Sequence, residues 1–524
     1  MNTIISFLAE NKMLYEVSGN QIFTKCPRCD KDDASLNPVS SFLIYSDTGY
    51  GECKKCQLNV SQNEWQDMVS PKNKIETGKP LKTRQYKKRP DESKTTVPSE
   101  PIPAVRVIKI DTPFVETSFE SWKRAIKINF PDLVFPAEVA ASVVAQILIT
   151  EITNPFALVL VGAPSSGKTI TINFFDDIEG ITYATDKFTP ASFISNASNV
   201  KKEDLSDIDL LPRIRYKAML IRDLATIFSK SEDSLNEALG LLTRVLDGQG
   251  LSTDSGTHGR RQYSGDYLFM MLAASTPIRP HVWKIMGSIG SRLFFLDMGT
   301  SEKSEEELVK QLITSSTKNM EKACKDMTKN FLYTLWSKNP NGIEWKKGDD
   351  DLHCIQIITR CAKLLARLRG VIHVREKTTG SSEVSYEYHP ATKEFPDRIT
   401  QLFYNLCRGH AVISGRKQIS SDDLRLIIEL TISSAPITRA NLLRGLLLKN
   451  GHMKTREVKA YLGCETPTAL KEMETLRILG IATITKESNG HVGEPEKKIH
   501  LSEDLEWFLS DECRAIRGLP PIPA

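Results

Sequence analysis

The segment LVLVGAPSSGKTITINFF, residues 158–175, places a lysine and a threonine directly after a run of small residues. Its centre matches the pattern G-x-x-x-x-G-K-[ST] and consists of Gly162, Ala163, Pro164, Ser165, Ser166, Gly167, Lys168 and Thr169. Glycines let backbone N–H groups approach phosphate oxygens closely. Lys168 is then expected to reach the β- and γ-phosphates and the Thr169 hydroxyl to bind Mg²⁺. The segment therefore predicts a site for a nucleoside triphosphate with Mg²⁺, and we expect ATP.

Such a loop needs an acidic residue at the end of a neighbouring strand. The best candidate is AMLIRD, in which four apolar residues precede Arg222 and Asp223. Many ATPases of this kind end that strand in two acids, the first for the Mg²⁺ shell and the second for the attacking water. Arg222 replaces the first acid, so Asp223 is expected to serve either purpose, and rapid hydrolysis is less expected. Asp207 and Asp209, in a polar segment upstream, are expected to be surface residues.

Two CxxC pairs lie near the N-terminus, Cys26 with Cys29 and Cys53 with Cys56. Four thiolates at this spacing suit tetrahedral Zn²⁺, and a site with four protein ligands predicts a structural metal. Between the pairs, SSFLIYSDTGYGEC predicts two short strands around a turn. The remaining cysteines are scattered singly, which indicates a reducing compartment, and the expected location is cytoplasmic.

The elements around the phosphate loop alternate between helical and strand patterns from about residue 118 to 300. The expected helices are 135–153 and 167–177, and the expected strands are 156–161, 218–221 and 267–273. Short apolar runs bounded by polar residues are typical of buried parallel strands. The alternation favours an α/β fold. Residues 303–430 read as mainly helical, interrupted by one hairpin with a turn at 378–382.

Length and composition set the remaining bounds. The chain has 524 residues, 40% of them hydrophobic, which suits three or four globular domains. The net charge of +4 says little about partners. No run of 18 apolar residues predicts a membrane span, and the N-terminus lacks the features of a signal peptide. Residues 71–105 are basic and poor in large apolar residues, which predicts a flexible tether with weak, salt-sensitive affinity for phosphate backbones.

Three further segments resemble parts of AAA+ ATPases. YLFMMLAASTP resembles the sensor-1 strand and puts Thr276 at its polar position. GSRLFFL resembles the segment with the arginine finger, which would make Arg292 the residue that reaches a neighbouring subunit's nucleotide. FPDRI resembles the start of a lid helix pair, with Arg398 as the sensor-2 arginine. Over residues 118–430, the motif order is most similar to the minichromosome-maintenance-like helicase branch. The catalytic residues that this resemblance implies are Lys168, Asp223, Thr276, Arg292 and Arg398.

That branch inserts a hairpin before the sensor-1 strand, and residues 246–267 have a matching insert. The segment holds five glycines and His258, Arg260 and Arg261, with few large apolar residues. It is expected to protrude as a mobile loop. By the resemblance, its two arginines would line the pore of a ring and contact DNA. The alternative is an ordinary connection with incidental arginines.

The C-terminal residues 437–501 read as three helices followed by two strands around a glycine-containing turn, which resembles a winged helix. In the third helix, core spacing is seen at Leu470, Met473, Leu476 and Leu479, and Thr468, Lys471 and Thr475 would face outward. Lys497 and Lys498 fall on the return strand of the wing. DNA binding through Lys471 and Lys497 is expected, and a protein-interaction module is the alternative.

The expected organisation combines these parts into an α/β protein with a P-loop AAA+ core. Its segments are a zinc ribbon similar to that of bacterial and phage primases (1–70), a basic linker (71–110), the ATPase core (111–302), a helical lid region (303–432) and a winged helix (433–524). The expected function is an ATP-dependent DNA helicase or translocase of a mobile element or phage-like replicon. It would act on single-stranded or forked DNA as a homo-oligomer, a hexameric ring, alongside replication proteins. The alternatives are an ATP-switched loader or scaffold and a transcription regulator.

Overall fold

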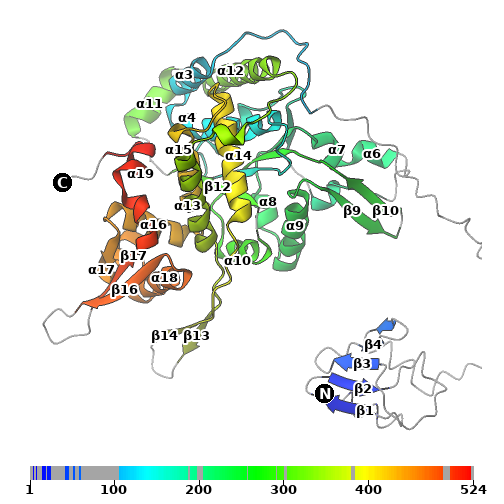
Figure 1. Cartoon of the computed structure of the whole chain (residues 1–524), viewed down its shortest axis with the longest axis vertical. Helices are drawn as coiled ribbons and strands as arrows, with labels where there is room; N and C mark the ends of the chain where they lie inside the picture. Colours follow the sequence, from blue (N-terminus) through cyan, green and yellow to red (C-terminus); the bar gives the residue numbers. More distant parts are fainter. Residues whose placement is uncertain are drawn as a thin grey trace, which may run out of the picture. The chain divides into compact units, whose positions relative to one another are not determined.

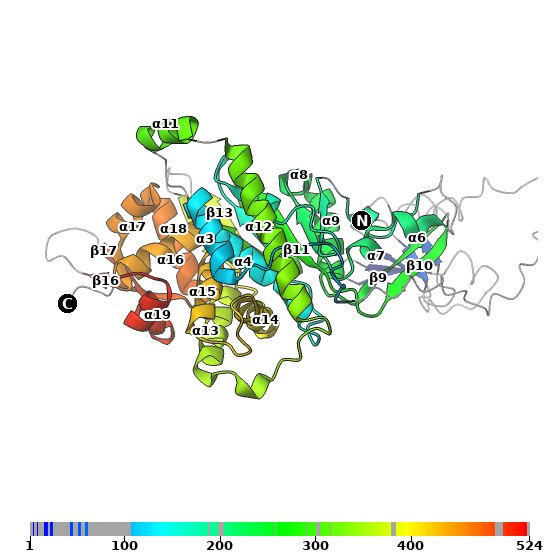
Figure 2. The same cartoon turned by 90° about the horizontal axis from the view of Figure 1, so that it is seen from above.

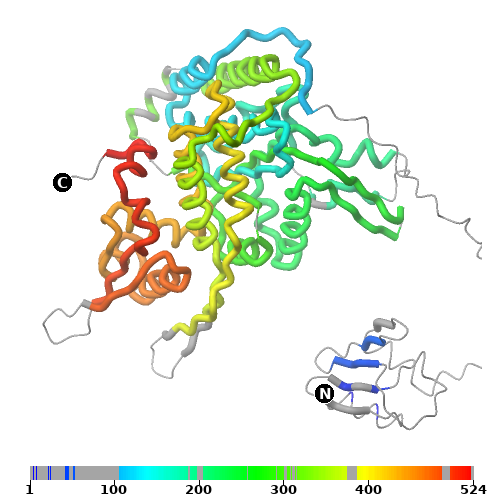
Figure 3. Tube along the Cα trace, in the orientation of Figure 1, coloured from blue at the N-terminus to red at the C-terminus, as the bar shows by residue number. Residues whose placement is uncertain are grey.

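The structure is a computed structural model that describes residues 106–520 and part of the preceding chain. The residues left out of the longer range are 187–188, 198–203, 257, 291, 300–303, 315, 379–383 and 488–495. Among residues 1–105 it describes Ile4, Leu8 and five short strands. The chain divides into two compact units, Met1–Thr96 and Val97–Ala524. Figures 1 and 3 colour both units along the sequence.

The first unit contains a five-stranded antiparallel sheet in the order β1-β2-β3-β4-β5. Its strands are β1 (Tyr15–Ser18), β2 (Gln21–Thr24), β3 (Phe42–Tyr45), β4 (Gly51–Cys53) and β5 (Leu58–Val60). β3 and β4 pair with each other, which confirms the two strands predicted between the cysteine pairs. Cys53 ends β4 and is buried, whereas Cys26, Cys29 and Cys56 lie outside the described residues.

The second unit is built around a five-stranded parallel sheet in the order β12-β6-β11-β8-β7. The strands are β6 (Ala157–Val161), β7 (Thr182–Thr185), β8 (Ala218–Ile221), β11 (Met270–Ser275) and β12 (Leu293–Asp297). This sheet confirms the expected α/β class. The prediction for residues 218–221 matches β8, and the one for residues 267–273 begins three residues before β11. Because the strands are parallel, they all end on one side of the unit, called here the carboxyl end of the sheet, and begin at the amino end.

Helices cover both faces of the sheet, so its strands are apolar on both sides. On β6, Leu158 and Leu160 pack into one hydrophobic core and Val159 into the other. The first face carries α3 (Phe119–Asn129), α4 (Val134–Ala145), α5 (Lys168–Asn173), α12 (Thr317–Lys338), α13 (Leu352–Leu368), α14 (Asp397–Ile413) and α15 (Leu424–Ser433). The second carries α7 (Leu210–Ile214), α8 (Ala225–Phe228), α9 (Glu232–Val245) and α10 (Pro280–Ile289).

The predicted helices over 135–153 and 167–177 are both shorter in the structure. α4 gives way at Gln146 to a 3₁₀ turn, and α5 ends at Asn173. Within the described residues, one helical stretch, Pro131–Leu148, is long and apolar enough to cross a membrane. However, 72% of it is buried inside the unit, and it packs against α14, β6 and β11. Its apolar composition therefore serves the protein core.

A two-stranded hairpin joins α9 to β11, as the insert at 246–267 predicts. It consists of β9 (Gly250–Ser255) and β10 (Gly259–Ser264), paired antiparallel. Figure 1 shows the hairpin extending beyond the helices of the second face. Its inward side chains Leu251 and Tyr263 are nevertheless buried in the core. The segment is therefore not a protruding loop throughout, since alternate residues of a strand face opposite sides and one side of the hairpin packs on the core.

The second unit has further peripheral elements. They are the helices α6 (Leu205–Ile208) and α11 (Glu305–Thr314) and the hairpin of β13 (Val374–Thr378) with β14 (Val384–Tyr388). The C-terminal module has α16 (Ile437–Leu448), β15 (His452–Lys454), α17 (Thr455–Leu462), α18 (Thr466–Leu479), β16 (Ala482–Glu487), β17 (Glu496–Leu501) and α19 (Asp511–Ile516). Its sheet has the order β15-β17-β16. The predicted helices and wing strands are present, and β15 is an addition that the sequence pattern did not indicate.

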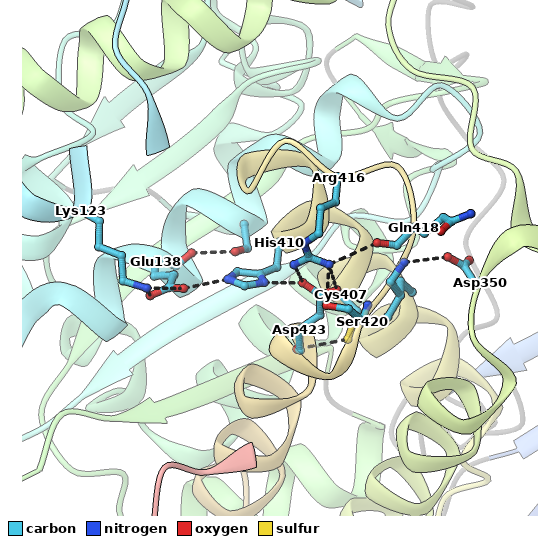
Figure 4. A network of polar contacts seen from close by, with 11 residues as sticks. Lys123, Glu138, Asp350, Cys407, His410, Arg416, Gln418, Ser420 and Asp423 are labelled. Carbon is cyan, nitrogen blue, oxygen red and sulfur yellow. Dashed lines mark hydrogen bonds and ion pairs between the residues drawn. The ribbon is translucent and has the colours of Figure 1, made fainter. Parts of the chain in front are cut away.

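An ionic cluster fixes α14 to α4 beneath the first face (Figure 4). The ring of His410 is buried between two carboxylates, with Nδ1 2.5 Å from Asp423 and Nε2 2.8 Å from Glu138. Arg416 donates to both oxygens of Asp423, and Lys123 lies 3.0 Å from Glu138. Burial opposes the charged ring, but hydrogen bonds and attraction to the two carboxylates outweigh it and raise the pKa of His410. Because both ring nitrogens face acceptors, the imidazole is held as a cation.

Candidate functional site

The loop GAPSSGKT connects the end of β6 to the start of α5, at the carboxyl end of the sheet. Gly167 has φ 86° and Ser165 has φ 66°, both in the left-handed region. At Gly162, an added Cβ would lie 2.6 Å from the Ser166 hydroxyl and 3.1 Å from Cβ of Met298, so only glycine fits. The loop is therefore tightly folded with its backbone exposed at the positions between these glycines, as phosphate binding requires.

Lys168 is the central cation of the loop. Its side chain lies back across the loop, and Nζ donates to the carbonyl oxygens of Gly162 at 2.9 Å and Ala163 at 2.6 Å. Burial lowers the pKa of Lys168, while attraction to Asp223 acts in the opposite direction. A partly desolvated ammonium requires acceptors, and neutral carbonyl oxygens are weaker ones than a phosphate oxygen. The site thus presents a cation whose present partners an anion can replace.

Thr276 lies beside this loop. β11 pairs with β6 so that Ser275 is opposite Val161, and the Gly162 N–H points to the Ser275 carbonyl at 3.4 Å. Thr276 therefore leaves the sheet next to Gly162, and its side chain is exposed. The strand order brings together the loop and the polar position that the sequence identified.

Asp223 follows β8, which is not a neighbour of β6 because β11 lies between them. The expectation of a neighbouring strand is wrong in this respect. Both strands nevertheless end on the same side, and Asp223 is close enough to Lys168 to influence its pKa. The carboxylate is exposed, with Oδ1 accepting from the Ala225 N–H at 2.8 Å. An acidic group next to the phosphate loop is thus available for binding.

Arg222 contacts acidic and polar side chains from neighbouring elements. These contacts explain why an arginine stands where many ATPases have an acid. Nη1 lies 2.6 Å from Asp186 after β7, Nη2 lies 2.9 Å from Asp176 after α5, and Nε donates to Asn173 at 2.9 Å. Hydrogen bonding to Asp186, more than its other contacts, raises the pKa of Arg222. The residue connects the ends of two strands and a helix, and so acts as a structural tie.

Two residues near the loop were missed by the sequence reasoning. Asp297 ends β12 directly opposite Val161, and Nη2 of Arg444 lies 3.2 Å from its carboxylate. Arg444 belongs to α16, the first helix of the C-terminal module. A second cation from a distant part of the chain therefore lies at this end of the sheet. An acid at the end of an apolar strand was a usable signal for Asp297, but only the packing of α16 could identify Arg444.

Arg292 and Arg398 lie together at the opposite, amino end of the sheet. Arg292 precedes β12 and bonds to Asp247 through Nε at 3.1 Å and Nη2 at 2.9 Å. Arg398, in the first turn of α14, bonds to Glu394 at 3.2 Å. Burial lowers the pKa of Arg292, and repulsion from Arg398 adds to the effect. The whole length of β12 separates this pair from the phosphate loop of the same chain.

The two arginines of the hairpin differ in their exposure and in their partners. Arg260 is exposed, whereas Arg261 is buried and pairs with Asp209, which is 0% exposed. Asp209 also accepts from Tyr263 Oη at 2.6 Å and from the Ser195 N–H at 2.7 Å. The predicted DNA contact through Arg261 is therefore wrong, as is the surface position of Asp209. Adjacent strand residues face opposite sides, so only one arginine of the pair can be exposed.

The third helix of the C-terminal module, α18, also departs from expectation. Thr475 is 5% exposed, so its predicted outward position is wrong. Lys471 lies over the ring of Tyr386 on β14 at 5.0 Å. The outer face of α18 thus contacts the β13–β14 hairpin. Lys497 is exposed on β17, as predicted. Figures 1 and 2 put this module and the β9–β10 hairpin on opposite sides of the second unit, so Lys497 and Arg260 belong to separate surfaces.

Metal sites are the remaining prediction. Within the described residues, no three His, Cys, Asp or Glu side chains form a group that could hold a metal ion. Three of the four zinc-site cysteines fall outside that range, so the zinc prediction stays a prediction. The sequence matches no known protein-family model, and no curated protein resembles it closely enough to count as a relative.

Proposed function

We propose that this chain is an ATP-dependent DNA helicase or translocase that acts in replication of a mobile element or phage-like replicon. The observation that carries the nucleotide part is the convergence of GAPSSGKT, Thr276 and Asp223 at one end of a parallel sheet. A loop of this type binds phosphate, with a hydroxyl and an acid beside it. The DNA part depends on the resemblance to the minichromosome-maintenance-like branch of AAA+ ATPases.

The residues of the loop fit Mg²⁺-ATP. Lys168 exchanges the carbonyls of Gly162 and Ala163 for phosphate oxygens, which are charged and therefore stronger acceptors. The Thr169 hydroxyl, on an exposed residue, would be the loop's ligand for Mg²⁺. Bound Mg²⁺-ATP supplies the phosphoryl group that is transferred to water. Asp223 would serve either the Mg²⁺ shell or the attacking water, and Thr276 would orient that water, while Arg222 stays in its structural contacts.

Arg292 supports an assembly of several copies. It is separated from the loop of its own chain by the length of β12, roughly 15 Å at strand spacing, which exceeds the reach of its side chain. Its action on a nucleotide then requires the loop of a neighbouring copy, as the resemblance implies. Arg398 beside it would act from the same surface. We propose a homo-oligomeric ring of six copies.

The terminal modules support work on DNA in the same proposal. The cysteine pairs and the antiparallel strands between them suit a structural Zn²⁺. The C-terminal module has the element order of a winged helix, with Lys497 exposed on the wing strand. Both types of module bind nucleic acid in other proteins, and both also bind proteins.

A strand-displacement assay tests the proposal. The full chain with Mg²⁺-ATP is expected to open a forked DNA duplex, and Lys168→Ala is expected to abolish opening while leaving the fold intact. Lys322→Ala is the matched control, because Lys322 is an exposed cation on α12 whose ion pair is with Asp326 of the same helix. Nucleotide-dependent DNA binding without opening, on forks of either polarity and on blunt duplex, would contradict the helicase assignment.

A second candidate is an ATP-switched loader or scaffold that binds DNA and recruits partners without unwinding. The observation in its favour is Arg222, which occupies the place of a metal-binding acid and is held by Asp176 and Asp186. With Asp223 as the single acid at that strand end, hydrolysis would be slow and the bound state long-lived. Turnover slower than nucleotide release, without duplex opening, would favour this candidate.

A further inference from the structure

A second basic surface lies away from the predicted DNA contacts. The segment RIRYK ends α7 and leads into β8 at the amino end of the sheet, and it places Arg213, Arg215 and Lys217 within five residues. Arg213 is exposed, and the other two side chains are half-buried. Burial lowers the pKa of Lys217, and repulsion from Arg213 adds to this, so the two cations are close together. Three positive charges are therefore concentrated on one short segment.

Three tyrosine rings lie against two of these cations. The Arg213 guanidinium lies 5.0 Å from the ring centre of Tyr183 on β7 and also donates to its hydroxyl. The Arg215 guanidinium lies 5.0 Å from the ring of Tyr216 and 4.8 Å from that of Tyr267. Guanidinium and phenol groups are flat, and flat groups at an exposed position such as the Arg213–Tyr183 pair are ones on which unpaired bases stack. The chemistry of the segment thus suits both parts of a nucleotide chain, its phosphates and its bases.

The backbone is distorted to present this arrangement. Tyr216 has φ 57°, in the left-handed region that bulky residues rarely adopt. Its hydroxyl donates to Asp266 at 3.0 Å, just after the β9–β10 hairpin. Arg215 reaches Tyr267 in the same connection. The segment is therefore joined to the base of the hairpin, and the two form one continuous surface.

The hairpin itself carries little positive charge. Arg261 forms an ion pair with Asp209, and Arg260 lies directly opposite Asp254 in the strand register. Opposed cross-strand charges offset each other. The cations at this end of the hairpin thus come from residues 213–217 and not from the hairpin strands.

We propose that Arg213, Arg215 and Lys217, with Tyr183, form a contact surface for single-stranded DNA at the base of the hairpin. This inference deepens the proposed function and rests on it for the identity of the ligand. Cations spaced along a short segment pair with successive phosphates, and the stacked planes accept bases without regard to sequence. The surface lies beside the hairpin, so a strand bound there is gripped where hairpin movement acts on it.

The test is binding of a fluorescent oligothymidine to the full chain, measured by anisotropy at several salt concentrations. Arg213→Gln/Lys217→Gln is expected to bind about tenfold more weakly, with a salt slope about 1.4 shallower, since each phosphate contact on a single strand contributes about 0.7. Lys284→Gln/Lys318→Gln is the matched control, because it removes two exposed cations elsewhere and should bind normally. Arg213→Gln alone, at an exposed position, should show half of the change in slope and guards against misfolding.

The outcomes separate this surface from the general proposal. Unchanged affinity and slope in both Arg213 variants would overturn the surface while leaving DNA binding in place. An equal loss in the lysine control would overturn it as well, because the effect would then reflect net charge. Poly-glutamate that displaces the oligonucleotide as well as unlabelled DNA does, at equal charge, would also overturn it, since an acidic polypeptide would then be the fitting ligand. No binding by the unsubstituted chain would contradict the proposed function itself.

Discussion

Two polar regions of this protein use the same residue types in opposite ways. At the carboxyl end of the sheet, Asp223 and Thr276 are exposed, and Asp223 accepts from one nearby N–H. In the ionic cluster under α14, Asp423 is 0% exposed and accepts from His410, Arg416 and the Ser420 N–H. The cluster has its hydrogen-bonding capacity filled by the chain itself, so it specifies the fold. The sheet end keeps that capacity open, so it is able to bind.

The largest expected effect is at Lys168. Lys168→Ala should reduce ATP hydrolysis by at least about 100-fold, because it removes the cation aimed at the phosphates. The melting temperature should stay within a few degrees, since the substitution also removes a desolvated charge. Steady-state phosphate release and thermal unfolding of the same samples check both statements. A large loss of stability with normal hydrolysis would instead mean that Lys168 serves the fold, as the residues of the ionic cluster do.

Arg292 is intermediate between the internally paired residues of the ionic cluster and the exposed residues at the carboxyl end of the sheet. It forms an ion pair with Asp247, yet its side chain is still 14% exposed. Arg292→Ala should lower hydrolysis by up to about 100-fold in the assembled protein, because it removes one donor to the transferred phosphoryl group. The decisive measurement mixes equal amounts of Arg292→Ala and Lys168→Ala chains. Activity should reappear in the mixture, because some interfaces then combine an intact loop with an intact arginine. A mixture as inactive as its components would mean that Arg292 is merely structural.

The Arg261–Asp209 pair is buried and paired within the chain, as the residues of the ionic cluster are. We therefore expect a substitution there to change the stability of the fold. Asp209→Asn should destabilise the second unit by about 3–5 kcal/mol, because it leaves a buried guanidinium without its charge partner. Urea unfolding followed by tryptophan fluorescence measures the change. The neighbouring substitution Arg260→Ala should stay within about 0.5 kcal/mol, as is usual for an exposed residue. Equal effects at both positions would refute the assignment of one arginine to the interior.

The ionic cluster should also make stability depend on pH. The raised pKa of His410 means that its contribution is complete below the ordinary pKa of about 6.5 and is lost as pH rises through the folded value. Hydrogen bonds to their partners outweigh burial and lower the pKa of Asp423 and Glu138, so their contribution is present above about pH 4 and lost as pH falls.

Urea unfolding between pH 6 and 9 tests this dependence. The unsubstituted chain should lose about 1–3 kcal/mol across the range, and His410→Gln should flatten the curve over the same interval. Hydrogen bonding to Asp423 raises the pKa of Arg416, so this arginine remains charged throughout and does not produce the slope itself. A variant that keeps the full alkaline decline would show that some other group titrates.

The smallest effect is expected at the contact between α18 and the β13–β14 hairpin. Tyr386→Ala removes the ring beneath Lys471 and should cost about 0.5–1 kcal/mol of stability. If α18 also contacts duplex DNA, freeing this lysine should strengthen that binding, measured by anisotropy with a short duplex. Unchanged duplex affinity would leave α18 as a helix that serves packing within the chain.

Much of the fold followed from local pattern. The apolar strands, the glycine-bounded loop and the helical core spacing of α18 are set by neighbours in sequence, and β8 falls at the predicted residues. The helix ends were less predictable, since α4 and α5 stop where tertiary packing turns the chain. Partners far apart in the sequence, such as Arg444 and Asp297, had no local signal at all.

By itself, the sequence determined the local pattern on which the proposed phosphate loop rests, because Gly162, Gly167 and Lys168 lie within eight consecutive residues. It also determined the α/β class, because strand and helix periodicities are properties of short segments. Only the tertiary structure decided which charged side chains are paired with other groups of the same chain. Whether an arginine is free depends on what lies opposite it, and for Arg222 and Arg261 those groups come from other strands and helices. An arginine connects parts of the fold at one position and is exposed at another, because packing, and not sequence, determines which groups lie next to it.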